Sequence, residues 1–268
     1  MLESFHVVVD AVIILGLSVS VSLLLLWVVR SLVPAERLRP HNEVSGFVYA
    51  VIGVIYAVIL GFVVITVWEG FQDAETTARL EATAVRDLYR ISEGLPEPSG
   101  QEMQEALVAY ASAVISEEWP AMTDGVTSGA QSMDEIDGLW AVIYDIEATT
   151  PAEEGLYASA LEQLLSLSNH RRERLEDAES GLLVMMWAVM IGGAVLTVLF
   201  PCLFGVENGL VHSLIIATLA ASIGLLLFVV YDLDRPYEGD MYVRPDGMTL
   251  VLEQLVGDDQ AFLEAAHR

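Results

Sequence analysis

The sequence has little positive charge and almost no cysteine. It contains no lysine, and its 12 basic residues, all of them arginine, stand against 38 acidic residues and give a net charge of −26. Such a chain lacks the basic patches with which proteins hold nucleic acid, so we expect no nucleic-acid partner. Cys202 is the one cysteine, which excludes an intramolecular disulfide and a cysteine-based metal cluster.

Enzyme motifs are missing as well. The sequence has no glycine-rich phosphate-binding loop, no nucleophile elbow and no pairing of a cysteine with a histidine. Its histidines do not follow the spacing of metal ligands. We therefore expect no catalytic residues, no metal site and no cofactor. The histidines concerned are His6, His41, His170, His212 and His267.

Long apolar runs, in contrast, are abundant. The mean hydropathy is +0.52, and four runs approach or exceed the roughly 20 residues that a helix needs to cross a bilayer. The only acidic residue in these runs is Asp10 and the only histidine is His212, and each lies near one end of its run. The runs predict an all-α integral membrane protein with four transmembrane helices, at residues 7–29, 47–68, 182–204 and 210–231.

Negative charge is concentrated outside these runs. Residues 69–181 hold 24 acidic residues against 6 arginines, a net charge of −18, and the C-terminal tail, residues 232–268, has a net charge of −6. Two interpretations stay open. The surface attracts cations, or the protein comes from a halophilic source, where an acidic surface repels itself little because the Debye length in molar salt is only about 3 Å.

The acidic region between the second and third spans is predicted to be a helical bundle, because no strand pattern occurs in it. Three stretches match the capping box, in which a hydroxyl residue and a glutamate three positions later cap a helix: Ser99–Glu102, Ser132–Glu135 and Thr150–Glu153. We expect the first of these helices to end before Pro120, since the residue before a proline disfavours helix geometry. Residues 121–131 are expected to form a loop.

The bundle is predicted to continue directly from two transmembrane helices. After Trp68 a heptad-like apolar row carries one odd member, Glu81, and the row that leads into the third span carries Arg171. At 1.5 Å per residue, Glu81 stands roughly 20 Å beyond Trp68 and Arg171 roughly 17 Å before Leu182. We therefore expect two unbroken helices that pack together and pair Glu81 with Arg171 or Arg174. The alternative is a solvated pair that contributes only about 0–1 kcal/mol.

One face of the second span is lined by small residues, at steps of three and four: Gly46, Ala50, Gly53, Ala57 and Gly61. Such a stripe lets neighbouring membrane helices approach closely. The alternative is that the stripe lines a pore in an oligomer, where apolar neighbours form a constriction that gates by dewetting. No charged residue lies near the middle of a span, which counts against pumps and proton relays but not against a passive pore.

The chain resembles the bestrophin-like family of prokaryotic membrane proteins of unknown function. The likeness covers nearly everything from His41 to Val243 and is most specific at Trp68-Glu69, Glu81-Ala82, Glu118-Trp119-Pro120, Arg172-x-Arg174 and Asp234-Arg235-Pro236. It is carried by residues 41–98 and by the stretches AYASAVISEEWPAM, NHRRERLEDAESGLLVMMWAVMIGGAVLTVLF and DLDRPYEGDMYV. The resemblance implies four membrane helices, a helical cytosolic part between the second and third, and a pentamer around an axial anion pore.

The sequence departs from that picture in its charge. An anion pathway would usually offer arginine or lysine, whereas the bundle is acidic, so cations are as well suited to it as chloride. The carboxylates after the last span do not match the spacing of the calcium site of regulated bestrophins, and we do not carry that site over. These carboxylates are Asp232, Asp234, Glu238 and Asp240.

Two functions from different classes therefore remain. One is an oligomeric passive ion channel, with the lipid bilayer, further copies of the chain and inorganic ions as partners. The other is a non-conducting membrane scaffold or sensor whose bundle binds a protein partner. Arginines in the first loop favour placing that loop in the cytosol, whereas arginines at the ends of the bundle and the resemblance favour a cytosolic bundle and cytosolic termini. We adopt the second orientation.

Overall fold

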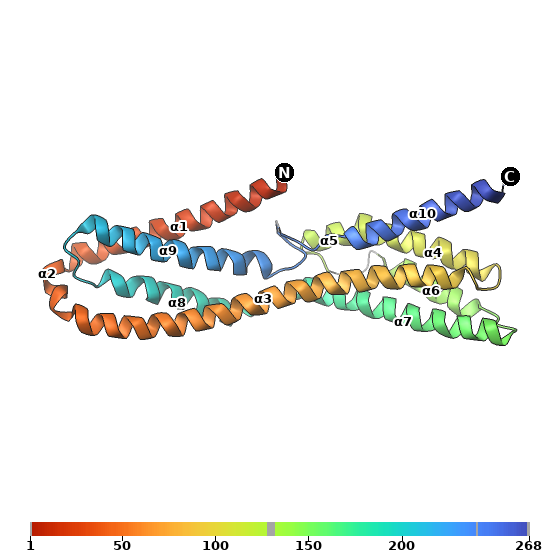
Figure 1. Ribbon diagram of the computed structural model, residues 1–268, viewed down its shortest axis with the longest axis horizontal. Coiled ribbons are helices and arrows are strands. Elements are labelled where there is room, and N and C mark those ends of the chain that lie inside the picture. Colours follow the sequence, from red (N-terminus) through yellow and green to blue (C-terminus); the bar gives the residue numbers. More distant parts are fainter. Residues whose placement is uncertain (1, 128–131, 240, 267–268) are drawn as a thin grey trace. The chain divides into compact units, whose positions relative to one another are not determined.

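The computed structural model describes the backbone of residues 2–127, 132–239 and 241–266, and the side chains of residues 7–127, 132–239 and 241–257. Within these residues the chain forms helices and loops and no β-strand (Figure 1), which confirms the predicted all-α class. It divides into two compact units, Met1–Glu69 with Gly181–Asp234, and Gly70–Ser180 with Arg235–Arg268.

The first unit contains the apolar helices. Four helices of the described chain are long and apolar enough to span a membrane, which matches the predicted number. The elements of this unit are α1 (Leu2–Leu32), α2 (Ala35–Leu38), the 3₁₀ turn η1 (Arg39–His41), the N-terminal part of α3 (Asn42–Ser92), α8 (Val184–Cys202) and α9 (Gly209–Leu233).

Close packing in the first unit depends on small residues at specific points. Helix α1 packs along α9 and also contacts α8. The Tyr56 hydroxyl of α3 donates a hydrogen bond to the Met190 carbonyl of α8 at 3.2 Å. A Cβ at Gly193 would lie 2.5 Å from the Tyr56 ring, so only glycine fits there without a shift of the ring.

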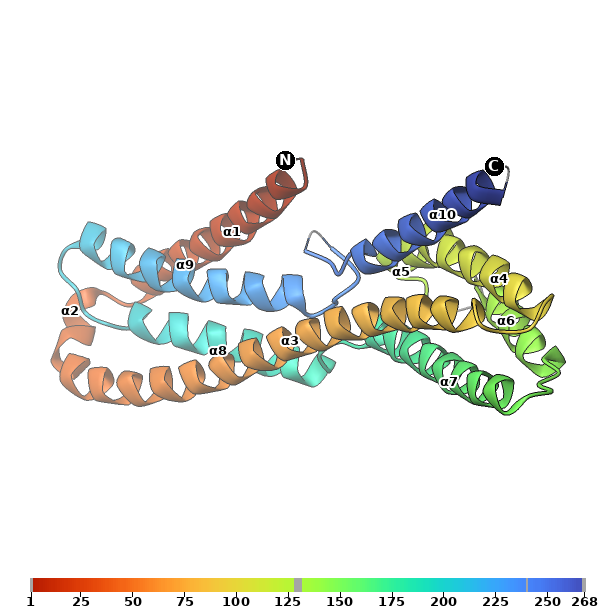
Figure 2. The same ribbon diagram turned by 45° about the vertical axis from the view of Figure 1, so that its right-hand side comes forward.

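The second unit is the acidic helical bundle, and Figure 2 shows its helices from a second direction. Its core is formed by the C-terminal part of α3 and by the helices between α3 and α8, together with α10. Its remaining elements are α4 (Ser99–Ala113), the π-helical turn η2 (Val114–Glu118), α5 (Trp119–Thr123), α6 (Met133–Asp145), α7 (Pro151–Glu179) and α10 (Asp246–Ala266).

The second span continues as an unbroken helix, as predicted. Helix α3 runs from Asn42 to Ser92 and passes Trp68 and Gly70 without interruption. Beyond Gly70 it buries an apolar row that includes Ala74 and Leu88, both fully inaccessible. A single glycine is a weak helix breaker, and here the packing of the following turns supports the helix.

The prediction of a second unbroken helix, from the bundle into the third span, is wrong. Helix α7 ends at Glu179, four residues, 180–183, are not helical, and α8 begins at Val184. The backbone of Ser180 and of Leu183 turns to extended ψ values of 149° and 140°. Side-chain periodicity continues through this stretch, which is why the sequence reads as one helix.

The break is stabilised by a residue that lies far away in the sequence. One carboxylate oxygen of Asp234 accepts the backbone N–H of Leu182 at 2.6 Å, and the other accepts the indole N–H of Trp187 at 3.1 Å. Leu182 lies just before Leu183, the N-cap of α8, so the Asp234 carboxylate holds the non-helical link between α7 and α8.

The predicted helix starts differ in how they are capped. Thr150 and Glu153 form a complete capping box at the start of α7, as expected. Ser99 and Ser132 do not cap: Ser99 is already the first residue of α4, and the Ser132 hydroxyl bonds to other side chains. Two of the three predicted capping boxes are therefore wrong, because neither α4 nor α6 has a side-chain hydrogen bond at its N-cap.

The helix expected to end before Pro120 continues past it. The π-helical turn Val114–Glu118 follows α4, and α5 then runs to Thr123, with Pro120 in its first turn. Proline has no N–H to donate, and the wider turn that precedes it, in which the Trp119 N–H bonds to the Val114 carbonyl, accommodates it within the continuing helix. The predicted loop 121–131 therefore starts later than expected, and its residues 128–131 lie outside the described chain.

Candidate pore face and buried charge cluster

The small-residue face of α3 has no partner within the described chain. A Cβ built at Gly46, Gly53 or Gly61 would meet nothing within 4 Å, and Ala50 and Ala57 are exposed. The buried residues of this part of the helix lie on an adjacent side, roughly 90° around the helix axis from the small residues, at Tyr56, Leu60, Val63 and Val67. The five small residues therefore lie together on a face that this chain leaves open.

The open face is apolar over its whole length. Between Glu43 and Glu69 helix α3 contains no acidic, basic or histidine residue. Large apolar side chains are exposed beside the small ones, at Phe47, Val54, Val58, Phe62 and Ile65. A pathway along such a face would hold no fixed charge, and its width would decide whether water fills it.

In the second unit, Glu81 lies in a bidentate ion pair with Arg174. The Arg174 Nε–H donates to Glu81 Oε2 at 2.5 Å and an Nη2–H donates to Oε1 at 3.1 Å. The Tyr110 hydroxyl donates to Oε1 at 2.5 Å. All three side chains are completely buried. A planar guanidinium matches a carboxylate in this fork arrangement, which adds geometric specificity to the attraction.

A second carboxylate, Glu118, joins the two arginines. It pairs with Arg174 through Oε2, and its Oε1 accepts an Nη2–H of Arg171 at 2.8 Å. The Ser132 hydroxyl accepts the Arg171 Nε–H at 3.0 Å and donates to Glu118 Oε1 at 3.0 Å. Two acids and two arginines thus alternate, and the buried charge cluster, Glu81, Arg174, Glu118 and Arg171 with Tyr110 and Ser132, has no net charge.

The charges within the cluster shift the pKa values of three of its members, Glu118, Arg174 and Tyr110. Burial alone would raise the pKa of Glu118, but the positive charges and hydrogen bonds of Arg174 and Arg171 outweigh it, and the pKa is lowered. Burial would lower the pKa of Arg174, yet Glu81 and Glu118 raise it. Burial and the nearby Glu81 raise the pKa of Tyr110. Tyr110 therefore keeps its proton and donates a hydrogen bond to Glu81.

The sequence left two partners open for Glu81, Arg171 and Arg174, and the structure shows one of them. The structure places Glu81 against Arg174, while Arg171 bonds to Glu118. The apolar periodicity does not identify Ser132. Glu118 lies four residues after Val114, at the next position of the apolar row of α4, and its place beside Trp119 and Pro120 in a family-specific motif is a second signal.

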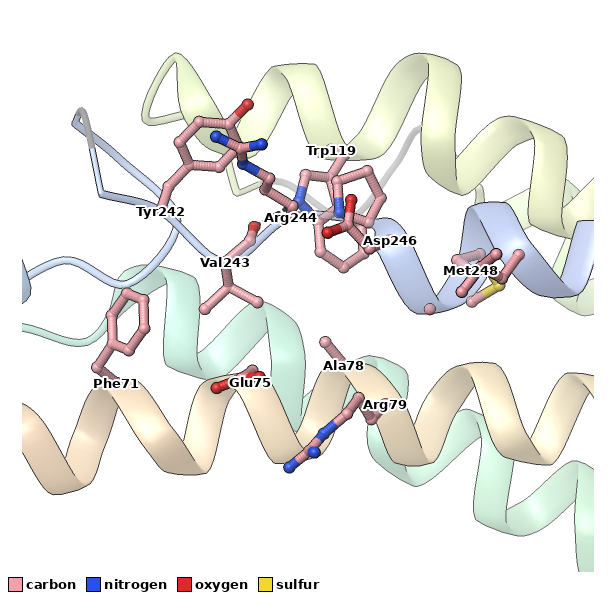
Figure 3. A pocket seen from close by; sticks show the side chains of 13 residues that line it. Phe71, Glu75, Ala78, Arg79, Trp119, Tyr242, Val243, Arg244, Asp246 and Met248 are labelled. Atoms are coloured by element: carbon pink, nitrogen blue, oxygen red, sulfur yellow. Dashed lines mark hydrogen bonds between the residues drawn. The ribbon is translucent and has the colours of Figure 1, made fainter. Parts of the chain in front are cut away.

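A cavity of about 500 Å³ also lies in the second unit, between α3 and the start of α10 (Figure 3). Its apolar lining includes Phe71 and Val243, and Figure 3 shows Val243 directed toward α3. The Arg244 guanidinium lies 5.9 Å from the Tyr242 ring centre, on the side away from α3 (Figure 3). Two acids, Glu75 and Asp246, and two arginines, Arg79 and Arg244, make up the charged lining.

The acidic residues after α9 do not gather into a metal site in the described chain. Asp234 is occupied by Leu182 and Trp187, and Glu238 pairs with Arg235 at 2.7 Å. No group of three His, Cys, Asp or Glu residues suited to a metal ion occurs in the described residues. Asp240 lies outside them.

The long apolar helices and the helical bundle define a multi-pass α-helical membrane protein. The family model of the Bestrophin-like domain matches residues 16–248, and the chain belongs to this family. A search of curated protein sequences found no match.

Solved structures share the fold at low sequence identity. A bacterial Bestrophin homolog from Klebsiella pneumoniae, phased by Zn-SAD, aligns over 92% of this chain and 97% of its own, with a TM-score of 0.65 and 14% identity. A single-site variant of that homolog aligns over 92% of this chain and 99% of its own, with a TM-score of 0.67 and 12% identity. A crystal structure of a membrane protein aligns over 92% and 98%, with a TM-score of 0.64 and 14% identity.

Proposed function

We propose that the protein is an oligomeric passive ion channel whose pathway lies along the small-residue face of α3. The observation that carries this proposal is the open face itself, which contains Gly46, Ala50, Gly53, Ala57 and Gly61 and finds no partner in the described chain. Family membership supports it, because the family is named for its likeness to bestrophin channels. In this assembly further copies of the chain, five by analogy with bestrophins, surround one axis.

The ion that passes is set by the charged parts of the chain. The apolar face carries no fixed charge, whereas the bundle region 69–181 has a net charge of −18. A negative surface concentrates cations near a pore entrance and depletes anions. Cations are therefore at least as well served as chloride, and the reversal potential under a salt gradient gives the sign.

Conductance of the purified protein in planar bilayers tests the proposal. Gly53→Val adds bulk to the open face, and we expect it to reduce the conductance about tenfold or more, because a dry constriction is sensitive to width. Gly16→Val on α1 is the matched control, since a Cβ at Gly16 also meets nothing within 4 Å. It should leave the conductance unchanged.

The opposite outcome identifies the alternative function. A monomer or dimer without conductance would contradict the channel and favour a membrane scaffold or sensor whose bundle binds a protein. Equal effects of Gly53→Val and Gly16→Val would place the pathway elsewhere than on α3.

We place the bundle and both termini in the cytosol. Single cysteines introduced at exposed bundle positions, in a Cys202→Ser background, report the orientation through a membrane-impermeant thiol reagent. Glu105 on α4 is exposed and suits this purpose. If the reagent labels Glu105→Cys in intact cells, the bundle lies outside the cell and the proposed orientation is wrong. If it labels the variant only after lysis, the bundle lies in the cytosol, as proposed.

A further inference from the structure

A second feature of the apolar unit is a groove among α1, α8 and α9 (Figure 2), three helices that contact one another. The groove has a volume of about 480 Å³, and the described residues that line it belong to these three helices. We call it the α1 groove. Its floor is buried and its rims are exposed, as shown by Ala194, Ala220 and Ile223 on the floor and Leu17, Leu24 and Val195 on the rims.

The lining of the α1 groove suits an apolar occupant. Its only polar side chains among the described residues are Ser18 and Ser22. Both hydroxyls already donate to carbonyls of their own helix, Ser18 to Ile14 at 2.8 Å and Ser22 to Ser18. A buried water needs roughly two to four polar partners, and a charged group would need more. The groove therefore has little to hold water or a polar ligand.

The width of the groove distinguishes between apolar occupants. On α1 the lining runs from Leu17 to Val28, a length of roughly 16 Å. Over that length a volume of about 480 Å³ corresponds to a mean width of roughly 6 Å. A helix with its side chains is roughly 10–12 Å in diameter, so a helix of a second copy is too wide to enter. An extended hydrocarbon chain, whose atoms contact their neighbours at roughly 3.5–4.0 Å, fits.

The depth of the groove in the membrane also matches a lipid chain. Helix α1 ends at Leu32, so Val28 lies roughly 6 Å and Leu17 roughly 22 Å from that end. The hydrocarbon core of a bilayer is about 30 Å thick, and the chains of one leaflet occupy about half of it. The groove therefore has about the length of one acyl chain and lies mainly in the leaflet next to residues 33–41.

We propose that the α1 groove holds one acyl chain of a membrane phospholipid as a resident ligand. The chain fills the space between α1 and the pair α8 and α9. It lies away from the proposed pathway, because α8 meets Tyr56 of α3 at Gly193, whereas Val195 and Ala194 line the groove. Lipid binding does not require conduction, so this proposal and the channel are tested separately.

A phospholipid with a photoreactive acyl chain tests the proposal. The full-length protein is reconstituted in vesicles of a phosphatidylcholine that carries a diazirine in the middle of one chain, irradiated, and mapped by peptide mass spectrometry. We expect cross-links concentrated in residues 17–28 of α1 and 220–227 of α9. Native mass spectrometry of the protein extracted without irradiation should show one phospholipid retained per chain.

Filling the groove should expel the lipid. Ala194→Leu adds bulk to the floor, and we expect the retained lipid and the cross-links to fall at least about fourfold, the effect of one displaced CH₂ group. Ala188→Leu is the matched control, because Ala188 is exposed on the same helix and does not line the groove. It should change both readouts less than about twofold.

If Ala194→Leu does not fold, Val195→Phe fills the groove from its rim and should give the same loss. Its control is Val189→Phe, because Val195 and Val189 are exposed on α8 to 53% and 48% and only Val195 lines the groove.

Three results would overturn the resident lipid chain. Cross-links spread evenly over the exposed positions of α1 would show ordinary contact with bulk lipid. Equal losses in a filling variant and its control would show that the effect is not local to the groove. A disulfide-linked dimer of Leu24→Cys in a Cys202→Ser background would assign the groove to a second copy of the chain.

Discussion

The two parts of α3 use small residues in different ways. Beyond Gly70, small side chains at Ala74 and Ala82 are buried, at 0% and 3% exposure, against helices of the same chain. Before Trp68, glycines at the same kind of spacing, such as Gly53, meet nothing. Spacing of this kind predicts that another surface will approach closely. It does not reveal whether that surface belongs to the same chain.

The difference shows which part of the chain packs its small residues without a second copy. In the bundle, the buried charge cluster and the buried alanines, Ala74 and Ala82, contact residues of the same chain. In the apolar part, the open face has no partner in the described chain, and in the proposed channel it faces the pore axis and the neighbouring copies. The strongest way to examine this contrast is to disturb the internal partners first.

Removing the central arginine of the bundle should have the largest effect. Arg174→Leu leaves Glu81 and Glu118 buried without their shared partner, and we expect a loss of about 3–5 kcal/mol. Thermal unfolding in detergent measures it. Arg172→Leu is the control, because Arg172 and Glu176 form an exposed pair at 3.7 Å, which should contribute less than about 1 kcal/mol. Equal losses would show that the cluster is not a buried network.

The same substitution in the two parts of α3 tests the contrast directly. Ala74→Leu overfills a fully buried position, and we expect it to destabilise the protein by about 1–3 kcal/mol. Ala57→Leu on the open face should change the unfolding free energy by less than about 0.5 kcal/mol. It should instead alter conductance or the oligomeric state seen by light scattering. A large loss of stability from Ala57→Leu without either change would mean that the face is not open.

Sequence reasoning found the helices and missed the interactions that join distant segments. Apolar periodicity is local and predicts the spans, the continuous α3 and the helical bundle. It could not detect the break at residues 180–183 or the contact of Leu182 with Asp234, because these two residues are about 50 positions apart in the sequence.

The candidate site was predictable only in part for the same reason. Glu81 stood out because a charge within an apolar row demands a partner. The identity of that partner could not be read from the repeat, because Arg171 and Arg174 lie on the same side of α7 and a second carboxylate, Glu118, pairs with both of them.

Two adjacent glycines of α8 distinguish a packed position from an open one in the apolar part. Gly193→Ala would place a methyl 2.5 Å from the Tyr56 ring, while a Cβ at Gly192 would meet nothing within 4 Å. We expect Gly193→Ala to lower stability by about 1 kcal/mol, since an aromatic ring can pivot to yield some of the space. Gly192→Ala should be neutral or slightly stabilising. The difference in melting temperature between these neighbours measures how tightly α3 and α8 meet.

Lowering the pH should have the smallest effect on stability, and we expect that effect in the bundle alone. The pKa of Glu118 is lowered in the folded protein, because Arg174 and Arg171 outweigh the effect of burial. A lowered folded pKa means that the carboxylate contributes stability above its unfolded pKa, about 4.3, and loses that contribution as the pH falls through the folded value. The stability difference between the natural protein and Glu118→Gln should therefore be constant from pH 7 to about pH 5 and shrink below about pH 4.

The difference between Ala57→Leu and the natural protein should not change over this range, because the open face between Glu43 and Glu69 contains no acid. If the second difference also shrank in acid, the two parts of α3 would not be independent in the way that their packing indicates.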